Sequence, residues 1–135
     1  MYVFTCTRPD IMHAVGEVAR HCEKNGKQLW TAAKRVLKYL KMTADFSIVF
    51  DGNNKHEPLG FADVSWASDL DSRRSTTGYV FFINNSVVSW KSKRQPTVAT
   101  SSTEAEYMAS YSATQEAVWL RLMLSNIGIR DLRHL

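Results

Sequence analysis

The sequence has 135 residues, of which 44% are hydrophobic, and it carries a formal net charge of +4 with a pI near 9.2. This length fits one domain or part of one, and the hydrophobic fraction excludes a disordered chain. The small excess of positive charge weakly favours an anionic partner such as nucleic acid. Two cysteines are too few for a disulfide scaffold, and no apolar run approaches the length of a membrane span.

The first ten residues, MYVFTCTRPD, do not have the pattern of a signal peptide, because Arg8 and Asp10 interrupt a short apolar stretch. Cys6 and Cys22 have no metal-ligand spacing, which makes a reducing compartment the default. We therefore expect an intracellular protein of the cytoplasm or nucleus that is not secreted and has no membrane partner.

Two helices are predicted in the first third of the chain. Residues 7–24 have apolar side chains at helical spacing, with Thr7 as a cap and Pro9 in the first turn. Residues 28–42 form a second amphipathic pattern with apolar positions Leu29, Ala33, Val36, Leu37 and Leu40. The opposite side carries Lys27, Lys34, Lys38 and Lys41, which indicates either a solvated face or contact with phosphates.

The middle of the chain has the composition of strands. Residues 46–50, 59–66, 78–84 and 86–93 are rich in aromatic and β-branched residues, and Asn84–Asn85 suits a tight hairpin turn. Residues 97–100 predict a further short extended piece. Short connections indicate an antiparallel meander of three or four strands. The expected fold class is therefore α+β, with two helices before the meander and a long helix covering it.

The long helix is predicted from Thr103 to about Ile127, with Gly128 as its C-cap. It follows the stretch SSTEAEYMA, in which Ser101–Glu104 and Thr103–Glu106 both have the spacing of a capping box. Residues two apart on a helix point in nearly opposite directions. Glu106 begins a stripe that includes Ala109, Ala113, Ala117, Leu120 and Leu124, so it is the better candidate to face the sheet.

Asp63 is the predicted counterpart of Glu106. Aspartate disfavours strands, so its place inside GFADVSW indicates either an edge or end position or a functional carboxylate. Two facing carboxylates are suited to Mg²⁺, which prefers oxygen ligands, and two such ions can promote phosphodiester cleavage. We expect Asp63 on the middle strand of the meander and Glu106 on the covering helix, close enough to share a cation.

Several segments together resemble the Pol polyprotein of copia-type LTR retrotransposons, at the end of the reverse transcriptase and the start of the RNase H domain. The matching segments are TRPDIMHAV, LGFADVSWASDLDSRRSTTGYVFFI, VVSWKSKRQPTVATSSTEAEYMA and EAVWLRLML. The resemblance implies an RNase H-like fold and cleavage of RNA in RNA–DNA hybrids during reverse transcription. It also implies that Asp63 and Glu106 are catalytic residues that bind Mg²⁺.

The sequence departs from the family pattern at two points. Ser65 stands where the family usually has a second aspartate next to the tryptophan. No segment resembles the later Cys-Asp-Asn-Gln-like strand that carries a third carboxylate, and Asp131 lacks the strand context to replace it. With two of four carboxylates, an RNase H-like domain over residues 46–135 would be incomplete and catalytically impaired. Residues 1–45 are expected to be the helical end of the reverse transcriptase.

The expected partner is an RNA–DNA hybrid or another nucleic acid. Candidate contacts are the basic residues Arg73, Arg74, Lys91, Lys93 and Arg94. Trp66 and Trp90 are either stacking surfaces or, more simply, core residues. Two alternatives stay open: a non-enzymatic nucleic-acid-binding or protein-interaction module, and a nuclease completed by acids from a second copy. An incomplete sheet would also expose an edge at which the chain could self-associate.

Overall fold

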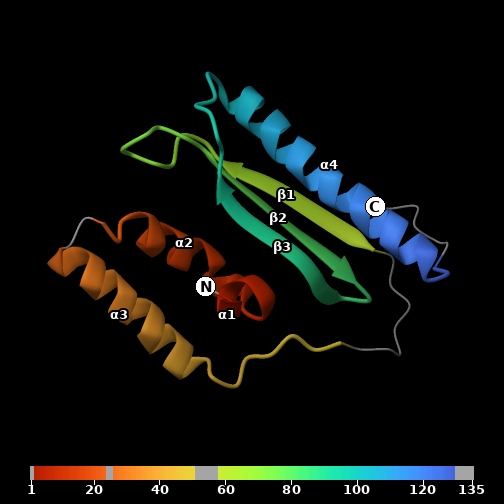
Figure 1. The fold of residues 1–135 in the computed structure, drawn as a ribbon, viewed down its shortest axis with the longest axis horizontal. Coiled ribbons are helices and arrows are strands. Elements are labelled where there is room, and N and C mark those ends of the chain that lie inside the picture. The colour runs from red at the N-terminus through yellow and green to blue at the C-terminus, as the bar shows by residue number, and fades with distance from the viewer. Residues whose placement is uncertain (1, 24–25, 51–57, 130–135) are drawn as a thin grey trace. The chain divides into compact units, whose positions relative to one another are not determined.

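The computed structural model describes residues 2–23, 26–50 and 58–129 of the chain. The chain forms two compact units, Met1–Ile48 and Val49–Leu135. The first unit is helical, and the second contains an antiparallel sheet and one long helix (Figure 1). This agrees with the α+β class predicted from the sequence.

The first unit consists of α1 (Tyr2–Cys6), the 3-10 helix η1 (Pro9–Ile11), α2 (Met12–Arg20) and α3 (Lys27–Met42). The helix predicted over 7–24 is confirmed over residues 9–20, where η1 runs directly into α2, whereas residues 21–23 form a turn. Pro9 disfavours helical backbone at Arg8, whose φ of −133° and ψ of 76° separate α1 from η1. Thr7 caps no helix, whereas Pro9 occupies the first turn of η1 as expected.

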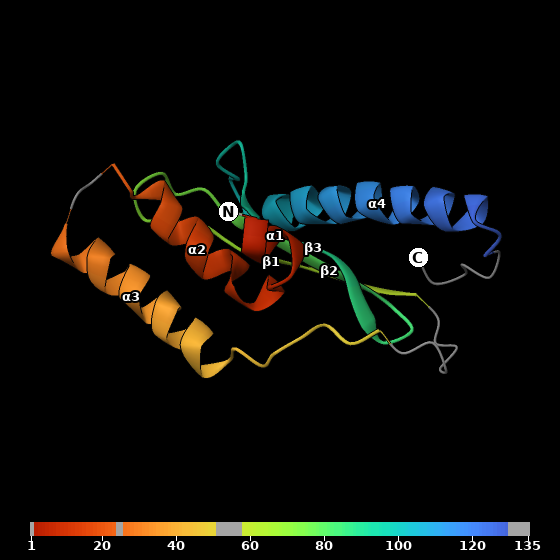
Figure 2. The same ribbon diagram turned by 60° about the horizontal axis from the view of Figure 1, so that its bottom comes forward.

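Arg8 links the beginning of the unit to the end of α3. Its guanidinium donates to the carbonyl oxygen of Thr43 at 3.1 Å and to the Thr43 hydroxyl at 2.6 Å. It also forms an ion pair with Asp10 at 2.8 Å and lies over the Tyr39 ring. Helices α2 and α3 lie side by side (Figure 2). On α3, Leu37 is exposed, so it does not belong to the apolar face that was predicted for it.

The second unit contains β1 (Leu59–Ser65), β2 (Thr76–Ile83) and β3 (Ser86–Arg94), ordered β1-β2-β3 and antiparallel throughout. Asn84 and Asn85 have φ values of 51° and 60°, as a type I′ hairpin turn requires. Residues 46–50 form no strand, and the prediction of one there is wrong. Phe46, Val49 and Phe50 are exposed, and residues 46–50 take part in no described strand ladder, although the Ser86 hydroxyl of β3 donates to the Val49 carbonyl oxygen at 2.7 Å. Residues 97–100 form no strand either.

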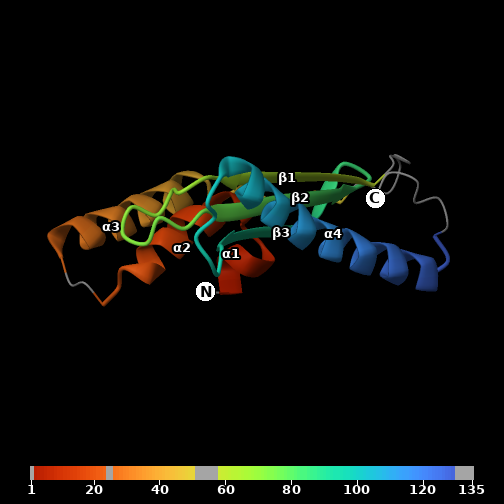
Figure 3. The same cartoon turned by 90° about the horizontal axis from the view of Figure 1, so that it is seen from above.

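Helix α4 (Ser102–Asn126) covers one face of the sheet (Figures 1 and 3). Ala109, Ala113, Leu120 and Leu124 of the predicted stripe are buried, and Leu120 packs with Ala113 against Phe81 of β2. The stripe begins at the buried Ala105, whereas Glu106 is exposed, so the expectation that Glu106 is buried toward the sheet is wrong. Small residues let the helix lie close to the strands, and burial of Leu120 contributes about 1.5–3 kcal/mol. Gly128, with φ of 89°, follows the helix, and the Ile129 amide donates to the Leu124 carbonyl oxygen. This is the expected C-terminal cap in its Schellman form.

Candidate carboxylate site at the edge of the sheet

Asp63 lies on an edge strand. Strand β1 pairs only with β2 among the described strands, and Asp63 stands opposite Gly78. The middle strand is β2, so the expectation that Asp63 lies on the middle strand is wrong. An edge strand tolerates a charged side chain because its side chains reach solvent. The edge alternative considered from the sequence therefore accounts for an aspartate within a strand.

The beginning of α4 separates the roles of its two glutamates. The Ser101 hydroxyl oxygen accepts a hydrogen bond from the Glu104 amide at 3.1 Å. The Glu104 carboxylate accepts from the amide of Thr100 at 2.6 Å and from its hydroxyl at 2.7 Å. These bonds from Thr100 lower the pKa of Glu104. Ser101 is thus the N-cap of α4 with Glu104 as its partner, and Glu106 does not serve in a Thr103 cap because Thr103 lies inside the helix.

Asp63 and Glu106 line one depression between β1 and α4. The depression has a volume of about 300 Å³, and its other lining residues are Ala62, Val64, Ala109 and Ser110. Both carboxylate residues are exposed. The fold therefore places on one small surface the two acids that the resemblance singled out.

The strand register gives the two carboxylates different directions. Tyr79 and Phe81 of β2 contact α4, and Ala62 stands opposite Tyr79. Side chains alternate along a strand, so Asp63, opposite Gly78, leaves the sheet on the face away from α4. The register thus counts against convergence of the carboxylates of Asp63 and Glu106. Their sharing of a cation stays a prediction.

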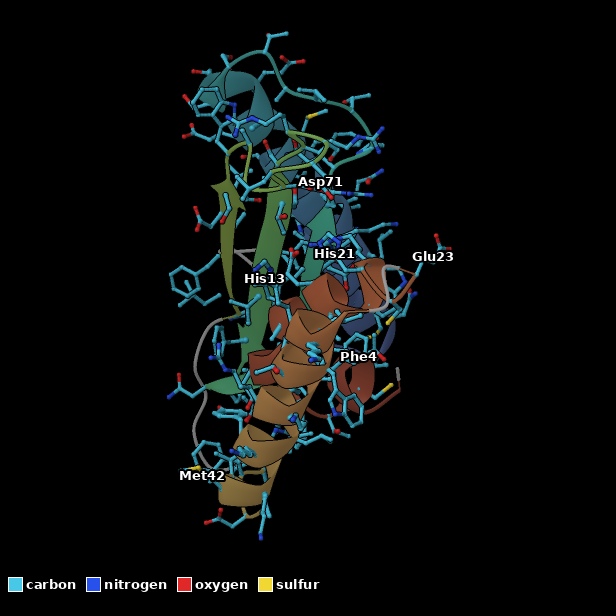
Figure 4. All side chains as sticks on the ribbon, turned by 90° about the vertical axis from the view of Figure 1, so that its left-hand side faces the viewer. Phe4, His13, His21, Glu23, Met42 and Asp71 are labelled. Atoms are coloured by element: carbon cyan, nitrogen blue, oxygen red, sulfur yellow. The ribbon has the colours of Figure 1, made fainter. Side chains whose placement is uncertain are left out.

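A two-ion magnesium centre does not fit these residues. Within the described ranges, no group of three His, Cys, Asp or Glu side chains could hold a metal ion. Figure 4 labels His13, His21 and Glu23, which come from α2 and the turn that follows it, in the first unit. The depression itself offers two carboxylates that point in different directions. No catalytic step through a metal is derived from it.

The basic residues predicted to bind nucleic acid differ in their partners and in their exposure. Arg94 is paired with Asp69 of the β1–β2 loop, and this pairing holds the pKa of Asp69 well below its usual range. Lys91 donates to the Ser112 hydroxyl at 3.1 Å and lies 5.5 Å from the centre of the Tyr79 ring, beneath α4. Arg73 and Lys93 are exposed, and Arg74 is half-buried. Trp66 is exposed as well, so it is not the core residue of the simpler interpretation.

Sequence reasoning missed a polar cluster between the sheet and α4. The Glu116 carboxylate accepts hydrogen bonds from the Ser89 hydroxyl at 2.6 Å and from the Tyr79 hydroxyl at 3.2 Å. Burial, the negative charge of Glu116 and this hydrogen bond raise the pKa of Tyr79 to about 12. A signal was present, because Glu116 has helical spacing with Ala109, Ala113 and Leu120 and so interrupts the buried stripe.

Gln95 fixes the beginning of α4 against the sheet. Its side-chain amide donates to the Thr77 hydroxyl at 3.0 Å and to the Ala105 carbonyl oxygen at 2.9 Å. Ala105 is fully buried and directly precedes Glu106 in the sequence. The distance between Glu106 and the edge strand β1 therefore depends on the hydrogen bonds of this buried glutamine.

Three relatives place the chain among known proteins. It is 43% identical over 133 residues to the retrovirus-related Pol polyprotein from transposon TNT 1-94 of Nicotiana tabacum, which covers 97% of this chain. It is 36% identical over 124 residues to the Pol polyprotein from transposon RE2 of Arabidopsis thaliana, which covers 92%. The chain belongs to the copia-type retrotransposon Pol family. It spans 10% and 8% of the lengths of these two Pol polyproteins.

A third relative of this Pol fragment has a different name. The chain is 48% identical over 120 residues to secreted RxLR effector protein 161 of Plasmopara viticola, covering 89% of this chain and 84% of that protein. This relative overturns the expectation that the Pol fragment is intracellular and not secreted, which rested on the absence of a recognisable leader pattern.

Two further comparisons are negative. No protein-family profile matches the Pol fragment, and no solved structure matches it. Across the described helices, none combines the length and the apolar character needed to cross a membrane.

Proposed function

We propose that this Pol fragment carries the first part of an RNase H-like domain, binds nucleic acid, and does not cleave RNA–DNA hybrids by itself. The depression lined by Asp63 and Glu106 supports the assignment, because these are the two catalytic positions that the resemblance implies. The order of three antiparallel strands followed by a covering helix also agrees with it.

The same depression supports the proposed loss of cleavage. Two-ion catalysis needs enough ligands to hold both ions, and only two carboxylates line this surface. The register turns the Asp63 side chain away from α4, so the carboxylates of Asp63 and Glu106 do not converge on one position for a cation. Poor positioning of reacting groups can cost orders of magnitude in rate. Any affinity of this site for Mg²⁺ is therefore expected to be weak.

Helix α3 supplies the best-supported surface for nucleic acid. It carries five basic residues and no acidic ones, and Lys27, Lys34, Lys38 and Lys41 are all exposed. Trp30 lies exposed among these lysines. Basic side chains beside an exposed aromatic ring suit contact with a phosphate backbone and an unstacked base. Arg73 and Lys93 of the second unit are additional candidates because they are exposed and oppose no carboxylate in a described ion pair.

A second candidate is a non-enzymatic protein-interaction module. One relative whose length the chain largely spans is named an effector protein and not a Pol polyprotein. In this alternative the exposed edge of β1 or another apolar surface binds a protein partner, and binding of RNA–DNA hybrid is absent even at low salt.

A cleavage assay with the purified chain and a labelled RNA–DNA hybrid in Mg²⁺ tests the proposal. We expect no cleavage above that of Asp63→Asn, together with salt-sensitive binding of the hybrid. If the chain cleaves the hybrid, and if Asp63→Asn and Glu106→Gln abolish this cleavage while Glu104→Gln does not, the chain is a functional nuclease. That result would contradict the proposed loss of cleavage. Glu104→Gln is the matched control because it changes an acid of the same helix that faces away from the depression. Absence of binding at low salt would favour the second candidate.

A further inference from the structure

The outward side of α4 carries an apolar surface that the described residues of the second unit leave exposed. Tyr107, Tyr111, Val118 and Leu122 form this outer stripe, and their exposed fractions are 74%, 67%, 49% and 62%. Trp119 borders the stripe and is also exposed. The stripe lies opposite the buried stripe that contacts the sheet, so α4 is apolar on two sides. A surface helix of a globular protein usually has only one apolar side.

The spacing of the outer stripe is that of helices that pair. Its members are separated by four, seven and four positions, which keeps them on one seam about 22 Å long. The two residues between Tyr111 and Val118 on this seam are Thr114 and Gln115, and both are uncharged. Gln115 donates to the Tyr111 hydroxyl at 3.0 Å. Arg121 lies about 70° around the helix from the seam, at its border.

The order of residues along the seam is self-complementary. When two copies of α4 run antiparallel about an axis between Thr114 and Gln115, Tyr107 lies opposite Leu122 and Tyr111 lies opposite Val118. Each contact then occurs twice, as two-fold symmetry requires. No charged residue of one copy faces a like charge of the other within the seam.

We propose that the outer stripe of α4 is the interface of a homodimer in which two α4 helices pack antiparallel. This interface is independent of the proposed binding of nucleic acid. In a parallel arrangement, each residue would face the same residue of the other copy. Tyrosine would then lie against tyrosine and the aliphatic residues against each other, so that large and small side chains would not alternate across the seam.

The available area sets the strength of this dimer. Tyr107 is about three-quarters exposed, Tyr111 about two-thirds and Trp119 about half. With Val118 and Leu122, the stripe offers roughly 500 Å² per copy. Stable dimers bury about 800 Å² per partner, and weak ones begin near 1,000 Å² in total. The expected dimer is therefore weak, with a dissociation constant in the micromolar range or above.

The edge of β1 is the competing site for a second copy. Pairing there would form a continuous sheet across the two chains. Asp63 lies near the middle of that edge, and a charged residue within an edge strand is a common feature that discourages such pairing. The outer stripe of α4 has no comparable obstacle, which is why we favour it.

Sedimentation of the full chain between about 1 and 500 µM tests the dimer. We expect a shift from monomer to dimer with rising concentration, and a monomer at every concentration for Val118→Lys. Leu70→Lys is the matched control, since Leu70 is a highly exposed apolar residue of the β1–β2 loop, and it should dimerise as the parent does. Phe61→Lys, on the edge strand, should also leave the dimer intact.

Complementary charges test the antiparallel register. Tyr111→Glu and Val118→Lys should each be monomeric alone and should form a heterodimer when mixed, because the two positions face each other. A parent chain that stays monomeric up to about 500 µM overturns the proposal. So does a dimer that persists in folded Val118→Lys or that is lost in Phe61→Lys. The helical content of each variant, measured by circular dichroism, separates loss of pairing from loss of folding.

Discussion

Ser89 of β3 and Glu116 of α4 are joined by a hydrogen bond of 2.6 Å between the sheet and its covering helix. The second oxygen of the same carboxylate accepts from Tyr79 of β2. Hydrogen bonds to an ionised acceptor are stronger than neutral ones, and two of them fix the rotation of α4 about its own axis. That rotation determines which residues α4 presents to the sheet and which it presents to solvent.

Replacing Glu116 by alanine should destabilise the protein. Both hydroxyl groups lose their acceptor in a half-buried position, and the expected loss is about 1–3 kcal/mol in the free energy of unfolding. Urea unfolding measures it. Gln115→Ala, next along the helix on the exposed side, should change the same quantity by less than about 0.5 kcal/mol. Equal effects of the two substitutions would contradict a structural role for Glu116.

The pair of Arg94 and Asp69 should make stability depend on acid pH. Arg94, followed by hydrogen bonds from Ser72, lowers the pKa of Asp69 in the folded state below its ordinary value of 3.8. A lowered folded-state pKa stabilises the protein above the unfolded-state pKa, and this contribution is lost as pH falls through the folded-state value. The parent chain should therefore lose stability progressively below about pH 4.

Asp69→Asn isolates this contribution. At neutral pH the variant should be less stable than the parent, and the difference should shrink as the pH is lowered below about 4. Arg94→Gln should show the same convergence, because the pairing is the main cause of the lowered pKa. Urea unfolding at several pH values measures both. A difference that stays constant over this range would mean that the pairing contributes nothing to stability.

Gly60 and Gly16 should respond in opposite directions to alanine. A Cβ atom on Gly60 would lie 2.3 Å from a ring carbon of Phe81, which is buried. Gly60→Ala should therefore destabilise the protein by about 1–3 kcal/mol through overpacking. At Gly16, inside α2, the nearest atom would be 3.9 Å away, at the end of the Arg20 side chain. Gly16→Ala should stabilise by about 0.5–1 kcal/mol. Thermal or urea unfolding of both variants measures these changes in stability. Stabilisation by Gly60→Ala would contradict the close packing of Gly60 against Phe81.

Binding of an RNA–DNA hybrid should depend on salt through α3. If Lys34 and Lys38 each contact a phosphate, Lys34→Gln with Lys38→Gln should lower the slope of log affinity against log salt by about 2. Lys91→Gln is the control, because Lys91 is engaged with Ser112 and Tyr79 and should leave the slope unchanged. Fluorescence anisotropy at several salt concentrations gives the slope. If Lys91→Gln lowers the slope and the double substitution on α3 does not, the binding surface lies on the sheet and not on α3.

In the second unit, the features that depend only on neighbouring residues were predicted well from the sequence. Two asparagines specify the hairpin turn, a serine and a glutamate specify the start of α4, and Gly128 specifies its end. None of these depends on distant residues. The strand predicted at residues 46–50 is absent because strand propensity describes fit to a pleated surface, and these residues join no ladder of the described sheet.

The direction of Asp63 could not be predicted from its own strand. In β1 the bulky Phe61 suggests the buried side, yet Gly60, Ala62 and Val64 are the residues that face α4. The alanine-rich stripe of α4 selects small partners, because the helix lies close to the strand. Which side of β1 is covered is therefore decided by residues more than forty positions later in the chain, and Asp63 follows from that choice.

The two-residue turn between β2 and β3 has a consequence for the order of folding. It joins neighbouring strands with almost no loop to close, and hairpins of this kind form in about 1–10 µs. β1 and α4 must close longer loops before they reach the hairpin, so their contacts form later. We expect substitutions at Asn84 or Asn85 to slow folding, and those at Leu120 mainly to accelerate unfolding. The hairpin is thus the template on which the rest of the unit assembles.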